Sequence, residues 1–178
     1  MKTCSFFGHR DTLQTEELKE KVRETVERLI LEEGVDTFLF GSRSKFDDLC
    51  HIVVTELKEK YPNIKRIYMR SQYSYLDKQY KDYLLKSYDD TTMPPRVEKA
   101  GRASYVERNQ EMINASDFCV FYYNPSYLPP KRKYSKRDIS DYQPKSGTAL
   151  AFNYANSRKI SGRMLVIINI CEGLGERF

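Results

Sequence analysis

The chain has 178 residues, of which 40% are apolar and 13% aromatic, and its formal net charge is +5. This length and composition fit one folded domain over residues 1–178 with its own core, and they exclude a disordered chain. The mild positive charge suits a small anionic ligand, whereas a dedicated nucleic-acid domain concentrates its basic residues on one face, so we do not expect nucleic acid as the partner.

Predicted strands and helices alternate along the chain. Short apolar runs predict the strands, and apolar residues at helical spacing predict the helices. Gly34 is expected to cap one helix at its C-terminus, and Pro62 to end another. The predicted strands are Thr3–Phe7, Asp36–Phe40, Lys65–Arg70, Asp117–Tyr123 and Met164–Ile170, and the predicted helices are Leu13–Gly34, Lys45–Tyr61, Tyr105–Ala115 and Gly147–Arg158.

Two longer segments interrupt this alternation. Ser71–Met93 is polar and rich in tyrosine, and we expect a short helix with irregular flanks there. Asn124–Lys145 is a loop rich in proline, lysine and arginine, and loops longer than about 12–15 residues usually carry function or move. Its basic part, Lys131–Lys145, is either a lid over a ligand or a solvated run of charge.

The alternation predicts an α/β fold: a single Rossmann-like, doubly wound parallel sheet of about five or more strands flanked by helices. The strands at Asp36–Phe40, Asp117–Tyr123 and Met164–Ile170 are nearly continuous apolar runs, as expected for strands covered on both faces. In such sheets a ligand binds beyond the carboxyl ends of the strands, near a topological switch point.

Glycine, hydroxyl and cationic residues follow the predicted strands or begin the last helix. A phosphate group needs backbone N–H groups without Cβ obstruction, hydroxyl donors and guanidinium groups, and these residues supply them. We therefore predict a phosphate-binding site formed by Gly8, His9, Arg10, Gly41, Ser42, Arg43, Ser44, Ser146, Gly147 and Thr148.

Each of these residues also has a structural interpretation. Gly8 and Gly41 suit tight strand-to-helix turns. Ser44 suits a helix N-cap with Asp47 in the capping-box position, and Ser146 suits an ordinary cap. A structural role for His9 is as reasonable as a catalytic one, and His51 is expected to pack within its helix. Neither GxGxxG nor GxxxxGK[ST] occurs in the chain.

The four cysteines, Cys4, Cys50, Cys119 and Cys171, match no zinc-binding or CxxC spacing. We expect reduced thiols in a cytoplasmic protein that carries no metal and no cofactor. The N-terminal "MKTCSFFGHR" lacks the apolar region of a signal peptide, and no apolar run approaches the roughly 20 residues that span a membrane. We expect no membrane association.

Four motifs in order, "FFGHR", "FLFGSRSKFDDLC", "YVERNQEMINASDFCVFYY" and "PKSGTALAFNYA", resemble the SLOG superfamily. That superfamily unites the Lonely-guy phosphoribohydrolases, the DprA-like DNA-processing proteins and small YpsA-like bacterial proteins. The resemblance is greatest to the small YpsA-like branch and covers nearly the whole chain. It implies a Rossmann-like fold that binds nucleotide-derived ligands.

The resemblance also implies roles for individual residues. In Lonely-guy enzymes a segment of the type MHxRKxxM supplies an arginine, and "YVERNQEM" resembles it, so Arg108 joins the predicted ligand site. A PGGxGTxxE segment supplies phosphate-binding backbone and a catalytic glutamate, and "PKSGTALA" resembles it. This chain retains Pro144, Gly147 and Thr148 but has Leu150 and Ala151 where that family is acidic.

The catalytic residues are therefore unassigned, with Arg108, Glu107 and Asp47 as candidates. Cleavage of an N-glycosidic bond would need a relocated carboxylate of suitable pKa. The carboxylates that could serve are Asp47, Asp48, Glu98, Glu107 and Glu111.

Three functions remain open. The first, which we favour, is a homodimeric sensor or sequestering protein for a nucleotide, cyclic nucleotide or ADP-ribose-type ligand, with Tyr73 or Tyr122 stacked on the base. The chain leaves no room for an effector domain, which favours sequestration or action through a partner. The second is a nucleotide N-glycosidase of the Lonely-guy type. The third is DprA-like DNA binding through the basic loop, with strong salt dependence.

Overall fold

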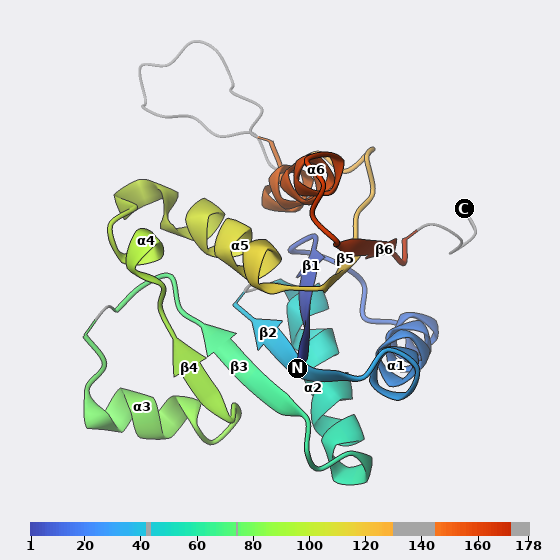
Figure 1. Cartoon of the computed structure of the whole chain (residues 1–178), viewed down its shortest axis with the longest axis horizontal. Coiled ribbons are helices and arrows are strands. Elements are labelled where there is room, and N and C mark those ends of the chain that lie inside the picture. Colours follow the sequence, from blue (N-terminus) through green and yellow to red (C-terminus); the bar gives the residue numbers. More distant parts are fainter. Residues whose placement is uncertain (42–43, 74, 130–144, 172–178) are drawn as a thin grey trace.

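The computed structural model describes residues 1–41, 44–73, 75–129 and 145–171. Within these ranges, six parallel strands form one sheet in the order β4-β3-β2-β1-β5-β6, and helices cover both of its faces (Figure 1). The predicted doubly wound, Rossmann-like α/β fold is confirmed.

The secondary-structure elements alternate as the sequence predicts, with small shifts at their ends. The strands are β1 (Lys2–Gly8), β2 (Val35–Phe40), β3 (Lys65–Met69), β4 (Asp90–Thr92), β5 (Phe118–Tyr122) and β6 (Val166–Asn169). The helices are α1 (Glu16–Leu31), α2 (Lys45–Lys60), α3 (Lys78–Leu84), α4 (Pro95–Glu98), the 3₁₀ turn η1 (Gly101–Ala103), α5 (Ser104–Ala115) and α6 (Gly147–Ile160).

Hydroxyl side chains begin three of the long helices. The first N–H groups of a helix lack intrahelical partners, and a serine or threonine at the N-cap satisfies one of them. Thr15 accepts from Leu18 N at 3.1 Å, Ser44 from Asp47 N at 3.1 Å, and Ser146 from Ala149 N at 3.0 Å. The cap roles predicted for Ser44 and Ser146 are confirmed.

The sheet separates two apolar cores. On one face, α1 and α2 pack Val22, Val26 and Val53 against Phe6 and Phe38 of the central strands. On the other face, α5 and α6 cover the alternate side chains of the same strands, because successive residues of a strand point to opposite faces. This second core contains Phe7, Leu39, Met112, Ile113, Cys119, Phe121, Ala151 and Ala155. Cys4, Cys50 and Cys119 are buried free thiols, and Cys171 is a partly buried one.

The structure corrects three details of the sequence prediction. The segment Ser71–Met93 holds the expected short helix, α3, but also the strand β4, which was not predicted. Helix α1 ends at the C-cap Glu32, and Gly34 instead takes a left-handed φ of +69° in the turn before β2. The last strand, β6, is an edge strand with half-exposed residues, so its apolar sequence does not reflect cover on both faces.

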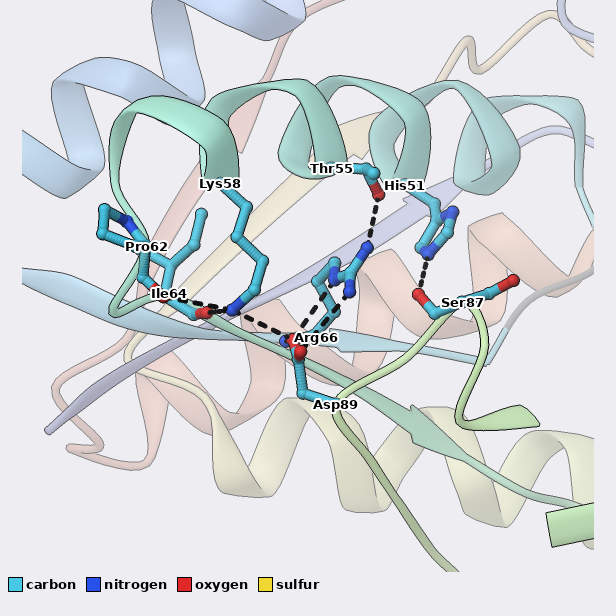
Figure 2. A network of polar contacts seen from close by, with 8 residues as sticks. All are labelled: His51, Thr55, Lys58, Pro62, Ile64, Arg66, Ser87 and Asp89. Atoms are coloured by element: carbon cyan, nitrogen blue, oxygen red, sulfur yellow. Dashed lines mark hydrogen bonds and ion pairs between the residues drawn. The ribbon is translucent and has the colours of Figure 1, made fainter. Parts of the chain in front are cut away.

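A polar network explains how so short a strand as β4 joins the sheet. Asp89 lies directly before β4 and accepts from the backbone N of Arg66 at 2.7 Å, while it forms ion pairs with the Arg66 and Lys58 side chains (Figure 2). His51 of α2 contacts the carbonyl oxygen of Ser87 at 2.9 Å and packs its ring against Tyr88. The prediction that His51 packs within the fold is confirmed.

None of the helices in the described ranges is both long and apolar enough to cross a bilayer. Those ranges also hold no group of three or more metal-ligating side chains.

Gly8 is where the packing tolerates no side chain. A Cβ built on Gly8 would lie 2.4 Å from Cβ and Cγ of Phe46, the second residue of α2. A Cβ built on Gly147 would meet nothing within 4 Å among the described residues. Gly8 is therefore required for the close approach of α2 to β1, whereas packing does not require Gly147.

We predict that Gly8→Ala lowers the free energy of unfolding by about 1–3 kcal/mol, the range typical of an overpacked core. Urea unfolding followed by circular dichroism measures the loss. Gly147→Ala is the matched control and should change stability by less than about 0.5 kcal/mol, as surface substitutions usually do. Equal losses in the two variants would contradict the role assigned to Gly8.

Candidate functional site

The topology places the switch point between β1 and β5. The chain adds β2, β3 and β4 on one side of β1, then returns to place β5 and β6 on the other side. Gly8 at the end of β1 pairs with Tyr122 at the end of β5, so the segments that follow both strands leave the sheet side by side. Ligands of open α/β sheets bind outside the carboxyl ends at such a point.

His9 follows β1 directly and is 4% exposed. Its Nε2 accepts a hydrogen bond from the backbone N–H of Asn124 at 2.9 Å, so the ring proton resides on Nδ1. The ring stacks on Tyr127, with centroids 4.1 Å apart. Nδ1 is buried and has no hydrogen-bond partner in the described structure, which leaves a donor at the switch point.

The charge state of His9 follows from its surroundings. Burial lowers the pKa of the imidazole, because the charged form loses its hydration. Protonation of Nε2 would also remove the acceptor of Asn124 N–H. His9 is therefore neutral at pH 7 and presents an N–H donor rather than a positive charge.

Gly41, the first residue after β2, is covered by the side chain of Arg108 from α5. A Cβ at Gly41 would lie 2.9 Å from Arg108 Cδ and 2.7 Å from the carbonyl oxygen of Met69. Arg108 is only 4% exposed, although it carries a full charge. Only a residue without a side chain at position 41 leaves room for the Arg108 side chain to lie across the end of the sheet.

Neighbouring polar groups orient the Arg108 guanidinium. Its Nη1 donates to Ser71 Oγ at 3.3 Å, and its Nε and Nη2 donate to Asn109 Oδ1 at 3.4 and 3.1 Å. The ring of Tyr105 lies 5.4 Å from the guanidinium carbon, within cation–π range. Ser71 lies where the sequence predicts the rim after the third strand, whereas Asn109 and Tyr105, the neighbours of Arg108 within α5, were not predicted as site residues.

Asp47, one of the catalytic candidates, lies in the first turn of α2 and is 2% exposed. Burial raises the pKa of its carboxyl well above the ordinary value; Asp48 adds to this, while the Arg108 charge and the Gly41 backbone N–H oppose it. Its Oδ1 is buried without a hydrogen-bond partner in the described structure. Asp47 thus lies within electrostatic range of Arg108, and its Oδ1 has no hydrogen-bond partner among the described residues.

Two backbone N–H groups at the start of α2 already have hydrogen-bond partners within the protein. Lys45 N donates to the carbonyl oxygen of Arg10 at 3.0 Å, and Asp47 N donates to Ser44 Oγ. The Arg10 side chain itself is exposed. The start of α2 is therefore hydrogen-bonded to the segment that follows β1. The predicted site residues Ser42 and Arg43 lie outside the described residues.

The start of α6 is exposed at Gly147, whereas the residues on either side of Gly147 are buried. Ser146 and Thr148 are each 8% exposed, and Gly147 leaves free space where a side chain would stand. Gly147, Leu150 and Ala151 line a groove of about 370 Å³ that α6 shares with α5. The α5 side of this groove includes Tyr105 and Asn109, the two residues that also contact Arg108.

Other candidates lie apart from this cluster. Glu107 forms an ion pair with Arg96 of α4 at 2.6 Å, and Glu111 approaches the same guanidinium at 3.7 Å. Tyr122 packs on Phe46 in the core, with ring centroids 5.7 Å apart. Tyr73 is 63% exposed at the carboxyl edge. Pro144 and all of the basic loop except Lys145 lie outside the described residues.

The doubly wound parallel sheet with a switch point between β1 and β5 places the chain in the Rossmann-like class of α/β folds. A model of the YpsA family, described as the YspA SLOG family, matches residues 4–154. The chain therefore belongs to this SLOG family, as the resemblance predicts. A comparison with curated proteins finds no match.

The buried Asp47 carboxyl predicts an unusual dependence of stability on pH. Because its folded-state pKa is raised, Asp47 contributes most to stability at low pH, and that contribution is lost as the pH rises from about 4 through the folded-state pKa. The amide introduced by Asp47→Asn stays neutral, so this variant should gain stability relative to the wild type between about pH 4 and pH 8. Each tenfold change in proton affinity corresponds to about 1.4 kcal/mol.

Urea unfolding of both proteins at several pH values measures this gain. An exposed carboxylate in the same turn, changed by Asp48→Asn, is the matched control and should show a smaller gain. If the Asp47→Asn variant instead lost stability relative to the wild type with rising pH, the Arg108 charge would outweigh burial, and the assigned direction of the pKa would be wrong.

Proposed function

We propose that this protein binds a small phosphorylated nucleotide-derived ligand at the carboxyl edge of its sheet and acts as a sensor or a sequestering protein. The observation that carries this proposal is the pair of buried, unsatisfied polar atoms, His9 Nδ1 and Asp47 Oδ1, at the edge where Arg108 lies. Buried polar groups nearly always have partners, so such atoms in one region favour a missing ligand or ordered water.

Each group suits one part of a nucleotide. Arg108 offers a guanidinium to a phosphate, and the open start of α6 at Gly147 offers backbone N–H groups and the positive end of a helix. Asp47 Oδ1 suits a ribose hydroxyl donor, and His9 Nδ1–H suits a ligand acceptor. Membership of the SLOG family supports a nucleotide-related ligand in general.

Binding without cleavage is the function we favour. The first turns of α6 carry Leu150, which is 37% exposed in the groove, and the buried Ala151, where the Lonely-guy pattern is acidic. We further propose a cytoplasmic homodimer, which is the default for related folds and is consistent with the free cysteines.

Asp47 supports a second candidate function, cleavage of an N-glycosidic bond. A buried carboxyl with a raised pKa is better suited to donate a proton to a departing base than an ordinary carboxylate. Asp47 meets this requirement better than Glu107, whose carboxylate is paired with Arg96. DprA-like DNA binding is the third candidate, and it depends on a basic loop that lies mostly outside the described residues.

The functions can be separated in one assay. The protein is incubated with nucleoside monophosphates, cyclic nucleotides, NAD and ADP-ribose, and the products are analysed by chromatography and mass spectrometry. We expect bound, unchanged ligand. Release of the free base, abolished by Asp47→Asn, would replace the binding function with the second candidate.

The position of the site is tested by Thr148→Arg, which places a long side chain at the start of α6. We predict at least a tenfold loss of ligand affinity, about 1.4 kcal/mol, in isothermal titration calorimetry. Ile160→Arg, at the exposed last residue of the same helix and outside the groove, is the matched control and should keep wild-type affinity. Unchanged affinity in Thr148→Arg would refute the assignment of α6 to the site.

A further inference from the structure

Arg70, which directly follows β3, is a buried cation that forms no ion pair with a carboxylate of the described residues. It is 8% exposed, and its backbone N–H donates to the Thr92 carbonyl oxygen at 2.8 Å, which fixes its position at the sheet edge. One guanidinium nitrogen, Nη1, donates to the carbonyl oxygen of Tyr73, whereas Nε has no hydrogen-bond partner among the residues that the structure describes.

Arg66, four residues earlier in the chain, is an arginine whose guanidinium has hydrogen-bond partners within the protein. It lies on the same face of the strand, because side chains of a strand alternate. Its Nε and Nη2 reach the two Asp89 oxygens at 3.2 and 3.3 Å, and its Nη1 donates to Thr55 Oγ1 at 3.0 Å (Figure 2). Within the described ranges, Arg66 is paired with a carboxylate, whereas the more buried Arg70 contacts a backbone carbonyl oxygen.

The segment that holds Arg70 also contacts the candidate site. Ser71, the next residue, accepts a hydrogen bond from Arg108 Nη1 at 3.3 Å. Tyr73 has a φ of +59°, a left-handed conformation that is uncommon for a residue other than glycine. Strained backbone of this kind persists where the surrounding structure imposes it, and it is concentrated at ligand-binding segments.

We propose that Arg70 is a second phosphate-binding residue and that the ligand carries a diphosphate, as a nucleoside diphosphate or a dinucleotide does. The inference rests on the proposed function. Arg108 binds one phosphoryl group, and Arg70, reached across Ser71, binds the next. A buried guanidinium is unfavourable unless it is paired, so the second phosphoryl group supplies the counter-charge that Asp89 supplies to Arg66.

The test compares the affinities of AMP, ADP, ADP-ribose and inorganic pyrophosphate by isothermal titration calorimetry. The wild type should bind ADP or ADP-ribose at least tenfold more tightly than AMP. Arg70→Gln should remove this preference by weakening the diphosphates while leaving AMP affinity within about twofold. If ADP-ribose binds more tightly than ADP, the ligand is of the dinucleotide type. If ADP-ribose and ADP bind equally tightly, the ligand is a nucleoside diphosphate.

Two further variants distinguish a loss of phosphate binding from a loss of folding. Arg70→Lys keeps the charge but loses the forked geometry, so it should retain part of the preference. Arg66→Gln removes the arginine near the other end of the same strand, and it should lower the melting temperature while keeping the preference for diphosphate. A lost preference in Arg66→Gln would overturn the specific role of Arg70.

The wild-type measurement alone decides the proposal if Arg70→Gln fails to fold. Equal affinities of the wild type for AMP and ADP would overturn the diphosphate inference and leave the proposed nucleotide binding intact. If the wild type bound none of these compounds, the proposed function itself would fall.

Discussion

The carboxyl edge of this sheet depends on one contact, in which the Arg108 side chain lies across the backbone of Gly41 beside the buried Asp47. The three residues come from α5, the end of β2 and the start of α2, so the contact ties together segments far apart in the sequence. It requires a residue without a side chain at Gly41, and it keeps the Arg108 charge buried. Buried charges are costly to a fold unless they are paired, which is why we connect this edge with binding rather than with stability.

The general architecture could be predicted because its signals are local. Helical periodicity located the long helices, and the spacing from Ser44 to Asp47 predicted an N-cap that the structure contains. The strand β4 was missed because its three residues, Asp-Thr-Thr, form no apolar run, and it joins the sheet through Asp89, which pairs with a distant arginine. Such a tertiary interaction leaves no recognisable pattern in the local sequence.

The candidate site was only partly predictable for the same reason. Gly8 was predicted from its place after a strand, but the reason no side chain fits there is Phe46, which lies far along the chain in α2. Arg108 came from a family resemblance, whereas its contact with Ser71, 37 residues away in the sequence, became visible only in the fold. The contrast between Arg66 in β3 and Arg70 directly after it likewise depends on packing that the sequence does not display.

The central claim is that the carboxyl edge between Arg108 and the start of α6 holds a phosphorylated nucleotide. The most direct measurement is a crystal structure of the protein with bound ADP. We predict phosphate oxygens within about 3 Å of the Arg108 guanidinium and of the backbone N–H groups near Gly147. Nucleotide density elsewhere, for example in the cavity between Lys58, Lys65 and Asp90 at the opposite edge of the sheet, with Arg108 left uncontacted, would contradict the account.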